Sequence, residues 1–242
     1  MNERRLTVTT ALIIINVVVF VVGLMVQRPA LLGIPYPQAQ PTSVFEIIGS
    51  YSWFSCMLEG QIWRVITYQF VHANFGHLLF NMWALYFFGP AVENVFGPKR
   101  FLTYYLLCGV AGALFSSVLA GMGFYSSLPY TLDTVQMVNY LANFSGYEGT
   151  VVPWQMIPLV GASAAIYGVM VAVAFMYPDV RISLLFPPVT MTMRTFAMVV
   201  IGIATAVILF NGGNAGGEAG HLGGIIMGAV IMLVWKLRGQ LR

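Results

Sequence analysis

Residues 219–237 read AGHLGGIIMGAVIMLVWKL, and this stretch decides the fold. Apart from His221 and Lys236, its side chains are apolar or absent. A helix of about 20 such residues crosses the roughly 30 Å hydrocarbon layer of a bilayer. Gly220, Gly224 and Gly228 recur at every fourth position and form a stripe that lets another membrane helix approach closely. We therefore expect a membrane helix with one histidine near its start.

Five further apolar runs of similar length precede this one. Apolar residues make up 59% of the chain and charged residues 8%, against roughly 25% charged in soluble domains. The sequence predicts an all-α, polytopic membrane protein: one domain over residues 1–242, with six transmembrane helices in the lipid bilayer. The first run lacks a small-residue cleavage site and is longer than a signal-peptide core, so we expect it to be retained. The predicted spans are about 6–26, 76–96, 101–123, 156–177, 191–210 and 219–237.

The basic residues indicate how the helices are oriented. Nine of them fall at connections on one side of the predicted bundle, and by the positive-inside rule both termini are cytoplasmic. The outer connections are then loop 1, about 27–75, and a longer loop, about 124–155. The net charge of +3 follows from this topology and gives no reason to expect nucleic acid as a partner. We expect Cys56 and Cys108 to be free thiols. The nine residues are Arg4, Arg5, Lys99, Arg100, Arg181, Arg194, Lys236, Arg238 and Arg242, and the outer side has only Arg28 and Arg64.

Three of the predicted spans carry a strongly polar or ionisable residue near one end: His77 and Asn81 in the second, Ser163 in the fourth and His221 in the sixth. Such residues are costly in hydrocarbon and usually face a protein interior or a water-filled cavity, so they are candidate site residues. Each lies near the outer end of its helix. Ser163 is about seven residues into its predicted helix, which corresponds to a depth of ~10 Å. The four side chains are therefore predicted to share one layer below the outer surface.

These residue types suit acyl transfer. A serine hydroxyl is a weak nucleophile that needs an adjacent base, and His221 can fill that role for Ser163. Small residues beside each favour close contact of the two helices: Ala164, Gly168 and Ala172 on one, and the glycine stripe on the other. Glu218 precedes the predicted last helix and Glu93 lies near the opposite face, so we expect a Ser/His dyad without a carboxylate.

Three further groups complete the candidate site. His77 and Asn81, spaced i and i+4, and the Ser163 backbone N–H can bind the negative oxygen of a tetrahedral intermediate. Tyr167, one turn after Ser163, can stack on His221. His72 precedes the second helix and is interpreted as structural. Each signal alone has a structural explanation, and their joint occurrence favours an enzyme.

The chain resembles the rhomboid family of intramembrane serine proteases. The matching strings are WRVITYQFVHANFGHLLFN at 63–81, GASAAIYG at 161–168 and GHLGGIIMG at 220–228, and the resemblance spans about 60–240. It implies the basic six-helix bacterial form, in the bacterial inner (plasma) membrane. It also implies that Ser163 is the nucleophile and His221 the base, and that His77, Asn81 and the Ser163 amide bind the oxyanion. Supporting roles fall to Tyr167, Gly161 and His72, and structural roles to Trp63, Arg64 and Glu93.

The chain departs from the family pattern at two places. Ala164 follows the predicted nucleophile where the family commonly has glycine, and we expect its methyl group to narrow the contact between the fourth and sixth helices. The outer loop of about 124–155 is longer than the family's short connection, and we interpret it as a passive insertion.

The expected activity is cleavage of a transmembrane or juxtamembrane segment of another membrane protein, through an acyl-enzyme on Ser163. Because an intact helix shields its peptide bonds, we expect substrates with helix-weakening Gly or Pro and a small residue before the cut. No cofactor or metal is expected. Two alternatives stay open: an inactive rhomboid-like protein that binds membrane helices, and a metal-binding or transport protein that uses His72, His77 and His221.

Overall fold

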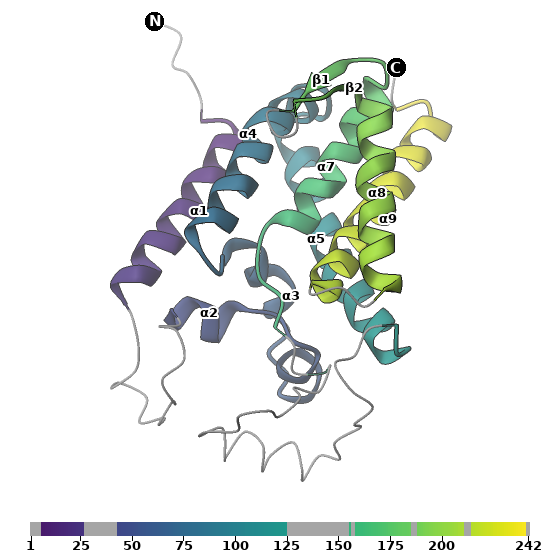
Figure 1. Cartoon of the computed structure of the whole chain (residues 1–242). Helices are drawn as coiled ribbons and strands as arrows, with labels where there is room; N and C mark the ends of the chain where they lie inside the picture. The colour runs from purple at the N-terminus through teal and green to yellow at the C-terminus, as the bar shows by residue number, and fades with distance from the viewer. Residues whose placement is uncertain are drawn as a thin grey trace, which may run out of the picture.

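The computed structural model of the protein describes residues 6–26, 43–124, 155, 158–184, 188–210 and 214–240. Long helices form a bundle in these ranges (Figure 1). Short elements lie in the connections: helices α2 (Val44–Gly49) and α3 (Arg64–Thr67), a π-helical turn (Phe54–Leu58), a 3₁₀ turn (Tyr68–Phe70), and the strands β1 (Arg181–Ser183) and β2 (Thr190–Thr192). The long helices are α1 (Val8–Met25), α4 (Phe75–Phe96), α5 (Pro98–Gly121), α7 (Ser163–Met176), α8 (Met193–Leu209) and α9 (Ala215–Leu237).

Each predicted span overlaps one of the long helices, although α4, α5 and α9 begin before their predicted spans. By length and composition α1, α5 and α9 are able to cross a membrane, and α7 and α8 are shorter apolar helices. The chain is thus a largely helical integral membrane protein, and the number of six crossings stays a prediction. Residues 27–42 of loop 1 and residues 125–154 of the predicted insertion lie outside the described residues.

The two ends of the described chain lie at the same end of the bundle. Figure 1 shows the start of α1, the end of α9 and the β1–β2 hairpin together there, with α2 and α3 at the opposite end. Arg181 pairs with Thr192 in the antiparallel hairpin. The Glu93 carboxylate on α4 accepts hydrogen bonds from the backbone N–H groups of Val8 and Thr9, which joins the start of α1 to α4.

Small residues set the distances between α5, α7 and α9. A Cβ atom added at Gly224 would overlap the backbone carbonyl of Ala164, and one at Gly228 would lie 3.0 Å from the Gly168 Cα. The Tyr104 hydroxyl on α5 donates to the Gly168 carbonyl at 2.7 Å. These contacts leave room for backbone but not for side chains, so the three helices form the tightest part of the bundle.

The start of α7 differs from the prediction. The span was expected from about 156, but the helix begins at Ser163, and residues 158–162 before it are not helical. Leu159 forms an antiparallel bridge with Tyr51, and Gly161 adopts a φ of +112°, which a helix cannot contain. Ser163 is therefore the first residue of its helix rather than about seven residues inside it.

Candidate active site

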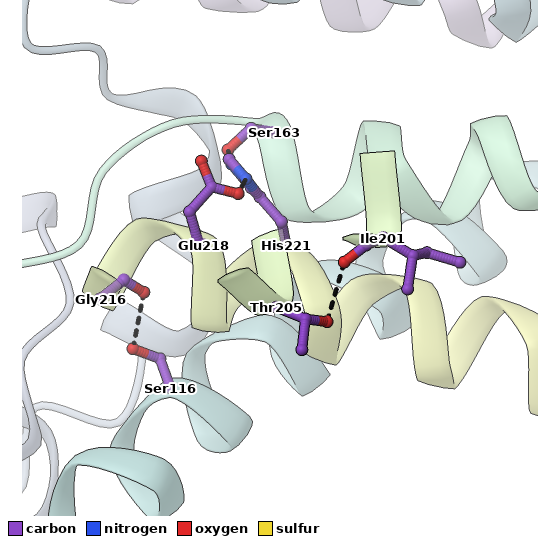
Figure 2. A network of polar contacts seen from close by, with 7 residues as sticks. All are labelled: Ser116, Ser163, Ile201, Thr205, Gly216, Glu218 and His221. Carbon is purple, nitrogen blue, oxygen red and sulfur yellow. Dashed lines mark hydrogen bonds and ion pairs between the residues drawn. The ribbon is translucent and has the colours of Figure 1, made fainter. Parts of the chain in front are cut away.

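The predicted nucleophile and base are in hydrogen-bond contact. Ser163 begins α7, and His221 lies in the second turn of α9. Its Nε2 atom is 2.8 Å from the Ser163 Oγ atom, and both residues are partly buried. The contact joins residues 58 positions apart. Figure 2 shows the two side chains meeting across the gap between their helices.

The contact between α7 and α9 depends on the two predicted small-residue stripes. Gly224 packs against the backbone of Ala164, and Gly228 packs against Gly168 one turn further along each helix. On α9, His221 lies one turn before Gly224. On α7, Ser163 immediately precedes Ala164. Backbone-to-backbone contact thus brings the imidazole and the hydroxyl together.

The Ala164 methyl group does not lie where we expected. A Cβ added at Gly112 of α5 would lie 2.5 Å from the Ala164 Cβ, so the methyl faces α5. The face of Ala164 toward α9 is its backbone carbonyl, next to Gly224. The expectation that this methyl narrows the α7–α9 contact is therefore wrong, because the glycine at position 112 leaves room for it.

Tyr167 stacks on the imidazole of His221. The ring centroids are 4.1 Å apart and the ring planes are inclined by only 8°. A flat ring packed on one face limits rotation of the imidazole. This geometry matches the stacking predicted for Tyr167.

A carboxylate contacts the other nitrogen of His221, contrary to the sequence interpretation. Glu218 Oε2 lies 2.9 Å from His221 Nδ1 (Figure 2). The interpretation was wrong because α9 begins at Ala215, four residues earlier than predicted, which puts Glu218 in its first turn. The Ser116 hydroxyl on α5 donates to the Gly216 carbonyl at 3.0 Å and supports that added turn.

His77 and Asn81 lie beside the chain segment that precedes Ser163. A Cβ at Gly161 would be 2.6 Å from Nε2 of His77 and 3.7 Å from Nδ2 of Asn81. The Asn81 side chain donates to the His77 carbonyl at 2.9 Å. The absence of a side chain at Gly161 therefore leaves both polar groups next to the backbone that leads into Ser163.

His72 contacts the same segment from the end of loop 1. The Ala162 N–H points to His72 Nε2 at 3.5 Å, and the His72 and His77 rings lie 5.1 Å apart, edge to face. Burial, and secondarily the nearby His77, lowers the pKa of His72 to about 3. A ring that stays neutral is suited to accept a hydrogen bond from backbone, which agrees with the structural interpretation.

Loop 1 holds the same segment by backbone hydrogen bonds. The Gly161 N–H donates to the Tyr68 carbonyl at 2.9 Å. Arg64 in turn donates to the Ser50 carbonyl at 2.6 Å, and the Trp63 indole donates to the Ile48 carbonyl at 3.3 Å. The predicted structural roles of Trp63 and Arg64 have a clear physical basis in these bonds.

Two further observations concern other kinds of site. In the described ranges, no group of three or more His, Cys, Asp or Glu side chains is arranged to hold a metal ion, and Cys56 and Cys108 are free. A cavity of about 350 Å³ between α1 and α2 is lined by residues that include Phe20, Glu46 and His72. Its lining does not include Ser163 or His221, so it is separate from their contact.

Comparisons with known proteins place the chain in one family. The rhomboid domain family matches residues 59–238. The rhomboid protease AarA of Providencia stuartii is 27% identical over 185 residues, which cover 76% of this chain and 59% of that protein. The rhomboid protease GluP of Bacillus subtilis is 27% identical over 179 residues, 74% of this chain and 28% of GluP.

A relative described as inactive also matches. Inactive RHOMBOID-like protein 8 of Arabidopsis thaliana is 33% identical over 101 residues, 38% of this chain and 29% of that protein. The matches to these three relatives span between 28% and 59% of their lengths. Similarity to the family therefore does not by itself establish activity.

Proposed function

The chain belongs to the rhomboid family, and on that premise we propose that it is an intramembrane serine endopeptidase that cleaves transmembrane or juxtamembrane segments of membrane proteins. The observation that carries the proposal is the 2.8 Å contact between Ser163 Oγ and His221 Nε2. A hydroxyl activated by an adjacent imidazole is the arrangement that acyl transfer requires.

In the proposed reaction, Ser163 Oγ attacks the carbonyl carbon of the scissile peptide bond while its proton passes to His221 Nε2. The resulting imidazolium donates that proton to the departing amine, and the C–N bond breaks to leave an acyl-enzyme. A water molecule then attacks the ester carbon and loses a proton to His221. The ester C–O bond breaks, and His221 returns that proton to the departing Ser163 Oγ.

His77, Asn81 and the Ser163 backbone N–H are the proposed donors to the oxyanion. The first N–H groups of a helix have no intrahelical partner, and Ser163 begins α7. Gly161 lies next to both His77 and Asn81, which supports placing both side chains beside the backbone that leads to the Ser163 N–H. In surroundings poor in water, each such donor contributes about 3 kcal/mol to transition-state stabilisation.

We further propose that both termini are cytoplasmic, that the membrane is a bacterial inner membrane, and that the site opens on its outer face. Basic residues in the end turns of three long helices support this orientation: Lys99 at the start of α5, Arg194 at the start of α8 and Lys236 at the end of α9. These helix ends lie at the end of the bundle where α1 starts (Figure 1). A substrate helix would enter beside α8, which buries only Met193, Ala204 and Ile208 among its 17 residues, the fewest buried residues of the long helices.

The proposal is tested with the purified full chain in liposomes and a single-pass substrate carrying Gly or Pro near its outer boundary. Wild type should release a product, and Ser163→Ala and His221→Ala should each lower the rate by at least about 10³-fold. A product formed equally by wild type and Ser163→Ala would contradict the mechanism.

Covalent labelling distinguishes the enzyme from the inactive rhomboid-like alternative without a substrate. A fluorophosphonate should react with wild type and not with Ser163→Ala, because only an activated serine attacks its phosphorus atom. A folded wild-type protein that neither cleaves nor reacts would favour the helix-binding alternative. Bound metal in purified protein, lost on mutation of His77 or His221, would instead favour the metal-binding alternative.

A further inference from the structure

Glu218 is placed to act on His221 from the side opposite Ser163. Its Oε2 atom lies 2.9 Å from His221 Nδ1, and the two side chains are only 17% and 13% exposed. This pair is thus shielded, unlike the exposed ion pair of Asp179 and Arg194, whose side chains are 85% and 62% exposed. We propose that Glu218 is a positioning residue that completes a Ser163–His221–Glu218 relay, an inference that rests on the proposed function.

The contact with Glu218 determines which ring nitrogen carries the proton. An ionised carboxylate can only accept hydrogen bonds, so the proton of the neutral imidazole resides on Nδ1. Nε2 then presents its lone pair to the Ser163 hydroxyl, which donates at 2.8 Å. The opposite tautomer would direct an N–H at Ser163 and could not remove its proton.

The same contact stabilises the charge that forms during the reaction. When the Ser163 proton moves to Nε2, the ring becomes a cation with its Nδ1–H still bonded to the carboxylate. The proton stays on nitrogen and Glu218 remains ionised. A hydrogen bond from a cationic ring to an ionised carboxylate is stronger than one between neutral groups, so Glu218 stabilises the imidazolium relative to the neutral ring.

The position of Glu218 is itself fixed by neighbouring groups. Its backbone N–H donates to the Asn214 carbonyl at 3.0 Å, and the Ser116 hydroxyl of α5 holds the carbonyl of Gly216 in the same turn. Tyr167 of α7 covers one face of the imidazole. The side chain therefore approaches Nδ1 from a supported helical turn rather than from a free loop.

Few other charged or titratable groups of the described chain lie near Glu218 and His221. From α4, His77 interacts electrostatically with His221. From α7, the neighbouring groups are the Ser163 and Tyr167 hydroxyl-bearing side chains. Among the described residues, the ion pairs include none between Glu218 and a lysine or arginine. The negative charge of Glu218 is thus directed to His221.

The test is an NMR measurement of ¹⁵N-labelled histidine in the full chain, with the His221 signal assigned by its loss in His221→Ala. In wild type the neutral ring should carry its proton on Nδ1. In Glu218→Gln, which keeps the side-chain shape but removes the charge, this preference for Nδ1 should weaken, because an amide can donate as well as accept a hydrogen bond. This readout does not depend on catalysis, so it stays informative if the proposed function fails.

Kinetics provide the second readout. Fluorophosphonate labelling near pH 7 should be about tenfold slower in Glu218→Gln, because the carboxylate no longer stabilises the imidazolium. Glu218→Asp keeps the charge and should recover part of the rate. Asp179→Asn removes an exposed carboxylate at the other end of α7 and should match wild type.

The opposite results would overturn the proposal. These are a resting wild-type ring protonated on Nε2, or a Glu218→Gln protein with an unchanged tautomer of His221 and an unchanged labelling rate. If Glu218→Gln does not fold, the tautomer of the wild-type ring decides. Wild type that shows the predicted tautomer but neither labels nor cleaves would contradict the proposed function alone.

Discussion

On the carboxyl side of Ser163, α7 is held by close contact of small residues with α5 and α9, whereas on the amino side residues 158–162 are held by hydrogen bonds to loop 1. The first region lies within the bundle, where lipid offers no hydrophobic force between helices and contact depends on shape. The second is not helical, so its backbone N–H and C=O groups need partners outside the segment. Ser163 is thus held by close packing of small residues on one side and by backbone hydrogen bonds on the other.

The largest expected effect is on the helix side, at Gly224. Gly224→Val would drive side-chain atoms into the Ala164 carbonyl and separate α7 from α9. We expect a loss of about 3 kcal/mol in the free energy of unfolding and no measurable cleavage. Thermal unfolding in detergent and the liposome assay measure both. Gly202→Val on α8, where an added Cβ meets nothing within 4 Å, is the control. Equal losses of stability and cleavage in Gly224→Val and Gly202→Val would contradict the idea that close α7–α9 packing positions Ser163.

The next effect is on the loop side, at Gly161. Gly161→Ala places a methyl group 2.6 Å from the His77 ring at a φ of +112°. We expect kcat to fall by about 10²-fold because the predicted oxyanion donors move. The free energy of unfolding should change less than in Gly224→Val. Gly60→Ala is the matched control, since Gly60 has a φ of +70° but open space around it. A similar fall in kcat for both would mean that backbone strain alone is responsible.

A smaller effect tests the fit between α5 and α7. Gly112→Ala brings two methyl groups to 2.5 Å and also approaches the Gly220 carbonyl at 2.8 Å. We expect a loss of about 1–2 kcal/mol in the free energy of unfolding, partly recovered when Ala164→Gly is added. Ala164→Gly alone should change cleavage by less than about twofold. A double variant no more stable than Gly112→Ala would show that the two positions are independent.

The smallest effect concerns His72. Because burial lowers its pKa from 6.5 to about 3, the unfolded chain binds more protons than the folded chain between these values. The free energy of unfolding should therefore fall as the pH drops below about 6.5. His72→Gln should make this dependence shallower. Denaturant unfolding at several pH values measures this dependence. If the free energy of unfolding varies with pH equally in wild type and His72→Gln, the lowered pKa of His72 is contradicted.

The sequence predicted the helix side of the site well. Glycine and alanine at four-residue spacing, with serine and histidine beside them, are local signals that lead directly to the α7–α9 contact. The stacking of Tyr167 follows from the same register. Each inference needed only the 3.6-residue period and the small size of the residues.

The loop side and the start of α9 were predicted less well. The apolar run from 156 gave no sign that α7 begins at Ser163, although Pro158 and Gly161 are both poor helix formers. The string NGGNAGGE indicates a loop by composition, yet its last four residues are helical because contacts with α5, including Ser116, outweigh the glycine cost. Glu218 was missed for this reason.

The fit of Gly112 against Ala164 has a consequence for how such chains diverge. A methyl group at 164 is tolerated only while position 112 carries none, so the two sites are expected to change together across generations. With glycine at 164, an alanine at 112 would be opposed mainly by the Gly220 carbonyl, 2.8 Å from its Cβ. We therefore expect selection to act on the combined volume of the two residues rather than on either identity alone.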